Sequence, residues 1–171
     1  MSGLAPEFSR RVDLRALPAA LDVAATADER RRLAARFGLV ALDRLEARAR
    51  FEPDGAAIDA AIAIVAAWVQ PCAVSGDDLA QGLDETVHVR FVPVAAPHGD
   101  IDAELAEDAA DEIEYEGGGF DLGEAIAQSM ALAIDPFATG PGAAAARAEH
   151  GLDGGGRTGP FAALGALRKD G

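Results

Sequence analysis

The sequence predicts an α+β domain built on an antiparallel β-sheet of about five strands, with two main helices packed on it. Two long stretches, residues 40–51 and 57–69, have strand-like alternation and are joined by the turn sequence E-P-D-G, as in a β-hairpin. Two further stretches have apolar residues at helical spacing behind a capping residue. The chain has 171 residues, of which 50% are hydrophobic, so we expect one domain with its own core.

The N-terminal part of the chain predicts two short strands followed by a helix. Residues 6–17 and 21–25 alternate apolar and polar positions, which indicates strands. Thr26 and Glu29 form a capping-box pattern, T-A-D-E, and the helix from Ala27 to Phe37 ends before a glycine. The apolar side chains that this helix places together are Leu33, Ala34 and Phe37.

The two strands of the hairpin differ in what their faces carry. Residues 40–51 have apolar side chains on one face and charged ones on the other, which indicates a half-buried strand. Residues 57–69 are apolar on both faces apart from Asp59, which predicts a central strand covered on both sides, although this alanine-rich composition also permits a helix. Residues 83–92 alternate again and predict a further strand.

Residues 117–137, G-G-G-F-D-L-G-E-A-I-A-Q-S-M-A-L-A-I-D-P-F, predict one helix with clear start and stop signals. Asp121 can cap the first turn, and Glu124 can reach back to the Asp121 amide. Pro136 ends the helix because it forces the preceding residue out of the helical region. The apolar stripe that we expect to face the core consists of Leu122, Ile126, Met130 and Ile134.

The remaining segments predict mobile or connecting structure. Residues 97–116 are strongly acidic with few apolar anchors, which is typical of a mobile loop. Residues 138–159 are rich in Gly, Ala and Pro and predict a flexible linker, and residues 160–171 regain apolar side chains as a short tail segment. The α+β domain is therefore expected to span residues 1–137.

Charge is distributed unevenly along this chain of net charge −14. Residues 1–50 hold ten arginines and seven acidic residues, a net +3, whereas residues 51–137 hold 19 acidic residues and one arginine, a net −18. A section this acidic repels nucleic-acid phosphates and attracts basic surfaces, which favours a basic protein partner over DNA or RNA. The acidic residues expected to face that partner are Asp100, Asp102, Glu104, Glu107, Asp108, Asp111 and Glu112.

A second interpretation concerns the arginines of the N-terminal part. On the helix from Ala27 to Phe37 and the strand after it, they can form a basic patch that contacts RNA phosphates. Interleaved acidic residues partly neutralise this patch and no aromatic stacking platform accompanies it, so a solvated helix face is the simpler interpretation. The arginines concerned are Arg30, Arg31, Arg32, Arg36, Arg48 and Arg50.

Several other classes of protein and site are disfavoured. No apolar run approaches the roughly 18 residues that a membrane helix needs, and the first 15 residues lack signal-peptide order, so we expect a cytoplasmic protein that does not bind membranes. Cys72 is the only cysteine, which excludes an internal disulfide and suggests a small apolar filler.

Two motifs match ligand-binding patterns only weakly. The spacing of His98, Asp100, Asp102 and Glu104 resembles a calcium loop without its glycine, and G-L-D-G-G-G-R-T at residues 151–158 resembles a phosphate-binding loop without its lysine or its preceding strand. The three histidines are scattered. We therefore expect no catalytic residues, metal or cofactor.

Several of these segments together resemble the YceD family of large ribosomal RNA subunit accumulation proteins, also called domain of unknown function 177. They are E-F-S-R at residues 7–10, R-F-G-L at residues 36–39 followed by A-L-D-R-L-E-A, the region around Cys72, the D-L-G-E helix, and P-F-A-A-L near the end. Many members have a C-x-x-C pair at the matching cysteine, where this chain has Ser75. The D-L-G-E signature helix carries Asp121, Leu122, Gly123, Glu124, Ile126, Met130 and Ile134.

The resemblance implies a role in the synthesis, processing or stability of 23S rRNA and supplies no catalytic residues. Combined with the charge distribution, it predicts a non-enzymatic factor whose acidic section binds a basic ribosomal protein or assembly factor, with at most weak or indirect rRNA contact. Two alternatives are a direct RNA-binding module that uses the arginine face and a small hydrolase or nuclease. A hydrolase would need histidine, cysteine and acidic side chains that converge in a pocket.

Overall fold

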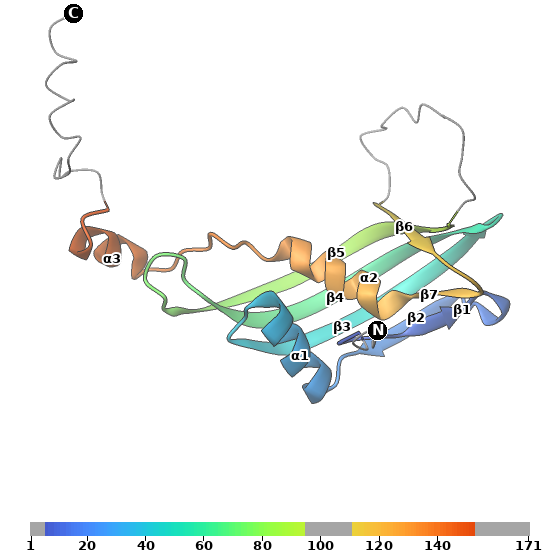
Figure 1. Ribbon diagram of the computed structural model, residues 1–171, viewed down its shortest axis with the longest axis horizontal. Coiled ribbons are helices and arrows are strands. Elements are labelled where there is room, and N and C mark those ends of the chain that lie inside the picture. Colours follow the sequence, from blue (N-terminus) through green and yellow to red (C-terminus); the bar gives the residue numbers. More distant parts are fainter. Residues whose placement is uncertain (1–5, 95–110, 153–171) are drawn as a thin grey trace, which may run out of the picture. The chain divides into compact units, whose positions relative to one another are not determined.

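The computed structural model describes residues 6–94 and 111–152 (Figure 1). These fall into two compact units, one of Met1–Gln70 and Ala80–Asp135 and a smaller one of Pro71–Leu79 and Pro136–Gly171. The elements in chain order are β1 (Arg11–Asp13), the 3-10 turn η1 (Leu14–Ala16), β2 (Ala20–Ala24), α1 (Ala27–Phe37), β3 (Ala41–Asp54), β4 (Ala57–Pro71), β5 (Asp78–Pro93), β6 (Asp111–Tyr115), β7 (Gly119–Asp121), α2 (Leu122–Ala133) and α3 (Ala143–Glu149).

The larger unit contains a mostly antiparallel five-stranded sheet in the order β2-β3-β4-β5-β6, which confirms the α+β class. β2 and β4 both pair with β3 in antiparallel fashion, whereas β6 pairs with β5 in parallel. β6 lies in the segment for which we expected only a loop. Its apolar residues are anchored, since Tyr115 is buried and donates a 2.6 Å hydrogen bond from its hydroxyl to the Ala56 carbonyl.

The β3–β4 hairpin forms as the alternation predicted, with a two-residue turn in which Gly55 has a φ of +62°. The even-numbered side chains of β4 from Ile58 to Trp68 are buried, but on the opposite face Ala63 is exposed and Val65 is half-buried. The prediction that β4 is covered on both sides is therefore wrong for the described residues. Alanine exposes little apolar area, so a face rich in alanine can meet water at small cost.

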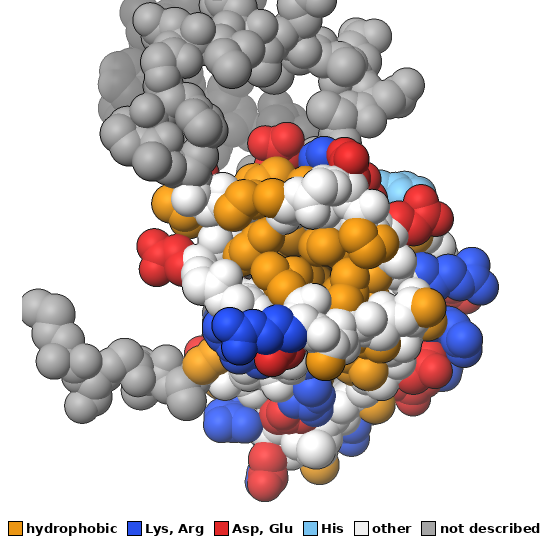
Figure 2. Space-filling model, turned by 90° about the vertical axis from the view of Figure 1, so that its right-hand side faces the viewer, with side chains coloured by type: hydrophobic (Ala, Val, Ile, Leu, Met, Phe, Trp, Pro, Cys, Tyr) orange, Lys and Arg blue, Asp and Glu red, His pale blue; other side chains and the backbone are white. Residues whose placement is uncertain are grey.

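At the end of this unit where the β3–β4 hairpin turns, hydrophobic side chains gather in the middle of the surface with charged ones around them (Figure 2). The structure contains no helix, within the residues that it describes, that is long and apolar enough to cross a membrane.

A two-stranded sheet of β1 and β7 brings the N-terminal segment to the start of α2. Val12 faces Phe120 in antiparallel register, so residues 119–121 form a strand, where the sequence predicted only a freely turning glycine segment before the helix. α2 then starts at Leu122 behind the predicted cap, since Asp121 accepts a hydrogen bond from the Glu124 amide. Its stripe faces the core as predicted, with Leu122 fully buried, although Ile134 caps the helix end and is only partly buried.

Phe120 of β7 lies at the centre of an aromatic cluster, most of whose members are far apart in the chain, so no local sequence pattern indicates it. Its ring stacks on Phe91 of β5, with centroids 3.9 Å apart and an interplanar angle of 13°. Phe51 of β3 and Tyr115 of β6 flank it at centroid distances of 5.8 and 6.4 Å. This one residue therefore joins the small sheet to three strands of the large one.

The smaller unit includes part of the stretch predicted to be a flexible linker. Residues 143–149 form the helix α3, and Ala143 is buried. Ahead of α3, the Ala73 amide donates to the Ala138 carbonyl at 2.9 Å. Residues 153–159 of the linker and the tail, residues 160–171, lie outside the described residues.

Candidate functional site

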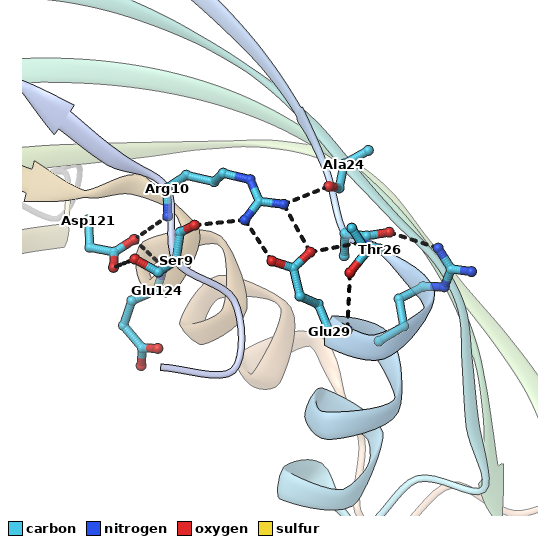
Figure 3. A network of polar contacts seen from close by, with 9 residues as sticks. Ser9, Arg10, Ala24, Thr26, Glu29, Asp121 and Glu124 are labelled. Atoms are coloured by element: carbon cyan, nitrogen blue, oxygen red, sulfur yellow. Dashed lines mark hydrogen bonds and ion pairs between the residues drawn. The ribbon is translucent and has the colours of Figure 1, made fainter. Parts of the chain in front are cut away.

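Three separate segments, E-F-S-R, R-F-G-L and D-L-G-E, meet in one network of polar contacts in the larger unit. Figure 3 shows the part of this network around Arg10, Glu29 and Asp121. We call it the motif network and define it by Glu7, Ser9, Arg10, Glu29, Arg36, Asp121 and Glu124. The first segment precedes β1, the second closes α1, and the third starts α2. The network therefore ties both ends of the domain sequence to the first helix.

Arg10 forms the best-shielded ion pair of the network. Its two guanidinium nitrogens donate to the two carboxylate oxygens of Glu29 at 2.7 and 2.9 Å, and one of them also donates to the Ala24 carbonyl. Arg10 therefore holds the pKa of Glu29 at about 2, against the desolvation that would raise it. Glu29 also accepts from the Thr26 amide at 2.8 Å, which completes the capping box predicted for α1.

Asp121 connects the N-terminal segment to α2. One of its carboxylate oxygens accepts from the Arg10 amide at 2.8 Å and from the Glu124 amide at 3.2 Å, and the other accepts from the Ser9 hydroxyl at 2.5 Å. A single side chain thus caps the helix and fixes the segment that precedes β1.

Glu124 does not reach back to the Asp121 amide as predicted. Its carboxylate instead accepts two hydrogen bonds from Arg36, at 2.8 and 3.0 Å, and Arg36 also contacts Glu7 at 3.1 Å. This charged partner lowers the pKa of Glu124. A bidentate contact with a guanidinium is stronger than one hydrogen bond from a neutral amide, so Glu124 binds the distant arginine and not the Asp121 amide.

Gly123 of the D-L-G-E motif allows α2 to contact the N-terminal segment directly. A Cβ atom at this position would lie 2.6 Å from the Phe8 carbonyl oxygen and 2.8 Å from the Arg10 amide nitrogen. Gly119 is similar, since a Cβ there would lie 2.1 Å from the Val12 carbonyl oxygen. Both glycines are required because no side chain fits between the two backbones.

The motif network holds the fold and lacks the parts of a catalytic site. Its acidic side chains all accept hydrogen bonds from arginines, hydroxyls or amides, and no histidine, cysteine or lysine belongs to it. It contains neither a nucleophile beside a free base nor an unpaired buried acid.

The predicted arginine patch is partly neutralised in the structure. Arg31 pairs with Asp28, Arg36 with Glu7 and Glu124, and Arg48 with Asp22. Arg30 donates to the Ala25 carbonyl at 2.8 Å. Only Arg32 and Arg50 of the six make no such contact with a described residue, and both are exposed.

The predicted acidic surface is described only in part. Asp100, Asp102, Glu104, Glu107 and Asp108 lie outside the described residues, as does His98. Asp111, Glu112 and Glu114 lie on β6, and Glu116 follows the strand. All four side chains are exposed. None of these four acids forms an ion pair with a residue that the structure describes.

Cys72 lies in the smaller unit, where backbone amides surround its sulfur. Sγ accepts from the Ser75 amide at 3.4 Å and from the Gly140 amide at 3.5 Å, while the Ser75 hydroxyl donates to Asp77. The hydrogen bonds from Ser75, followed by those from Gly140 and Val74, lower the pKa of the Cys72 thiol to about 6. The sulfur is buried and accepts hydrogen bonds, unlike the apolar filler that we expected.

The described residues bring together no metal-binding or acid–base cluster. No group of three or more His, Cys, Asp or Glu side chains in residues 6–94 and 111–152 is arranged to hold a metal ion. His88 is exposed on β5 and makes no hydrogen bond to a described residue, although it lines a hollow with Asp59. Asp59 itself is bound by Arg90 at 2.8 Å.

No family model, no curated protein and no solved structure matches this chain.

Proposed function

We propose that this chain is a non-enzymatic cytoplasmic factor of the YceD kind that supports the synthesis, processing or stability of 23S rRNA. The observation that carries the proposal is the motif network. E-F-S-R, R-F-G-L and D-L-G-E are far apart in the sequence, yet Arg36 contacts both Glu7 and Glu124, and Asp121 contacts Ser9. These direct contacts give a physical reason for the three motifs to occur together in one chain, because the side chains of each motif are hydrogen-bond partners of another.

The partner that we propose is a basic ribosomal protein or assembly factor. The acidic side chains on and after β6 support a basic partner, because none of them has an ion-pair partner among the described residues. By contrast, three of the six arginines of the predicted basic patch, Arg31, Arg36 and Arg48, are already paired with acidic side chains. Unpaired acids on one strand attract a basic surface and repel phosphates. The same comparison makes direct RNA binding through the arginine face the weaker alternative.

The test of the role is the ratio of large- to small-subunit rRNA in cells that lack the protein. We expect this ratio to fall and to be restored by the wild type. The double variant Glu112→Lys/Glu114→Lys should restore it poorly, because it reverses charge on the proposed partner surface. The matched control Asp43→Lys/Glu52→Lys changes two other exposed acids and should restore it fully.

An unchanged ratio in cells without the protein would refute the proposal. The partner is tested separately by binding to purified basic large-subunit proteins at rising salt. Affinity should fall steeply with salt, since the contact is between exposed charges. Binding that salt does not affect would contradict the acidic surface, and binding to naked rRNA that Arg30→Glu/Arg31→Glu/Arg32→Glu abolishes would favour the alternative.

A further inference from the structure

The strand β5 has an exposed edge that β6 covers only in part. β5 spans Asp78–Pro93, but β6 pairs with Val89–Pro93 alone (Figure 1). Residues 80–87 of the larger unit therefore have a strand neighbour, β4, on one side only. On their other side, no described residue hydrogen-bonds to their backbone. We call residues 80–87 the β5 edge.

The direction of the unpaired backbone groups follows from the pairing with β6. The Val94 amide donates to the Tyr115 carbonyl at 2.9 Å, so Val94 points its backbone groups toward β6. Backbone groups alternate sides along a strand, which places those of Gly82, Asp84 and Thr86 on the same open side. The β5 edge contains neither proline nor lysine, the residues that commonly block strand addition.

The side chains along the β5 edge define what kind of strand fits there. Asp84 and Glu85 are exposed and form no ion pair with a described residue. Leu83 and Val87 are partly buried against the core. An added strand would thus meet acidic groups and half-exposed apolar side chains, and beyond its end the acids of β6.

We infer that the β5 edge binds an extended basic segment of a partner protein by strand addition, with lysine or arginine alternating with apolar residues. The inference rests on the proposed function in that it states how the basic partner is held. Backbone hydrogen bonds would supply affinity and the acids would select a basic segment. A second copy of this chain is disfavoured, because antiparallel pairing of two such edges around Glu85 sets Glu85 opposite the Glu85 of the other copy.

The direct test is amide hydrogen exchange at the β5 edge, with a capped nine-residue peptide of alternating lysine and valine as the probe. In the free protein the Asp84 and Thr86 amides should exchange fast. With saturating peptide they should exchange at least about tenfold more slowly, because each gains a hydrogen bond. A peptide of alternating glutamate and valine should leave them unchanged.

Two variants at one position separate backbone from side-chain effects. Thr86→Pro removes the outward amide, and Thr86→Ala keeps it. We expect Thr86→Pro to weaken peptide binding about tenfold, while Thr86→Ala stays within about twofold of the wild type. If Thr86→Pro does not fold, the charge reversal Asp84→Lys/Glu85→Lys, which leaves the backbone intact, should weaken binding by at least as much.

Several results would overturn the inference. One is slow exchange of the Asp84 and Thr86 amides in the free protein, which would mean that this chain or a second copy already occupies the edge. The others are the absence of peptide binding and peptide binding that does not protect these two amides. The cellular test distinguishes this failure from failure of the proposed function. If loss of the protein lowers large-subunit rRNA and Thr86→Pro restores it, the function stands and the β5 edge is not its partner site.

Discussion

The motif network and the β5 edge belong to the same unit but use their polar groups in opposite ways. In the network, Asp121 accepts three hydrogen bonds and Glu29 is held by Arg10 and Thr26. At the β5 edge, Asp84 and Glu85 form no ion pair with a described residue, and the backbone is paired on one side only. The polar groups of the motif network are hydrogen-bonded within the chain. The β5 edge has backbone groups and acidic side chains that can still bind a partner.

This difference separates residues that hold the fold from residues available to a partner. Three of the segments that resemble a known family, E-F-S-R, R-F-G-L and D-L-G-E, meet in the network, where their side chains contact one another and Gly123 lets two backbones approach. The β5 edge belongs to none of the quoted motifs. Changes in the network should therefore alter stability first, and changes at the edge should alter binding with little effect on stability.

The largest loss of stability is expected at the glycines that α2 and β7 need. Gly119→Ala and Gly123→Ala each force a Cβ into backbone atoms, so we expect about 4 kcal/mol of destabilisation or failure to fold. Gly118→Ala is the control, because nothing lies within 4 Å of a Cβ there. Urea unfolding of the three variants measures the difference. If Gly123→Ala were as stable as Gly118→Ala, the close packing of α2 on the N-terminal segment would be wrong.

The aromatic cluster should show the next largest effect. Phe120→Ala removes a ring that is 3% exposed and stacked on Phe91, and we expect it to cost about 3 kcal/mol. Leu132→Ala is the control, because that side chain on α2 is 81% exposed. Thermal unfolding compares the two variants. Equal midpoints for Phe120→Ala and Leu132→Ala would contradict the central place of Phe120.

The Arg10–Glu29 pair should make stability depend on acid. The pKa of Glu29 is about 2 in the folded chain against an ordinary 4.5, so its contribution is present above about pH 5 and is lost as pH falls toward 2. We expect Glu29→Gln to cost about 1.5 kcal/mol at pH 7 and progressively less toward pH 2. Unfolding by urea at pH 7, 4 and 3 measures this change.

Glu46→Gln is the control for that series. Glu46 pairs with Arg44, but both side chains are at least half exposed, so the substitution should change stability by less than about 0.5 kcal/mol. A difference between wild type and Glu29→Gln that stayed constant from pH 7 to 3 would show that the Arg10 contact does not depress this pKa.

The smallest effect on stability is expected on the acidic surface. Glu112→Lys/Glu114→Lys changes exposed side chains without ion-pair partners among the described residues, so the free energy of unfolding should stay within about 0.5 kcal/mol. The same variant should weaken salt-sensitive binding of basic large-subunit proteins. A large loss of stability would place β6 among the parts that hold the fold and would weaken the contrast between the two regions.

Some of the fold could be predicted because its signals are local. The capping box of Thr26 and Glu29 and the glycine after Phe37 gave α1 its observed bounds. Alternation and the E-P-D-G turn predicted the β3–β4 hairpin, since a period of two and a tight turn both act over a few residues. Asp121 was predicted as a cap for the same reason.

What only the tertiary structure decided are contacts between residues far apart in the chain. Glu124 could cap the helix at the Asp121 amide three residues away, yet it binds Arg36, 88 residues away, because a guanidinium that donates two hydrogen bonds is the stronger partner. The parallel pairing of β6, the ring of Phe120 on Phe91 and the open face of β4 likewise depend on which elements become neighbours. The sequence alone determined α1, α2, the β3–β4 hairpin and the caps at Thr26 and Asp121. Packing decided which charged side chains pair within the fold and which form no ion pair with a described residue.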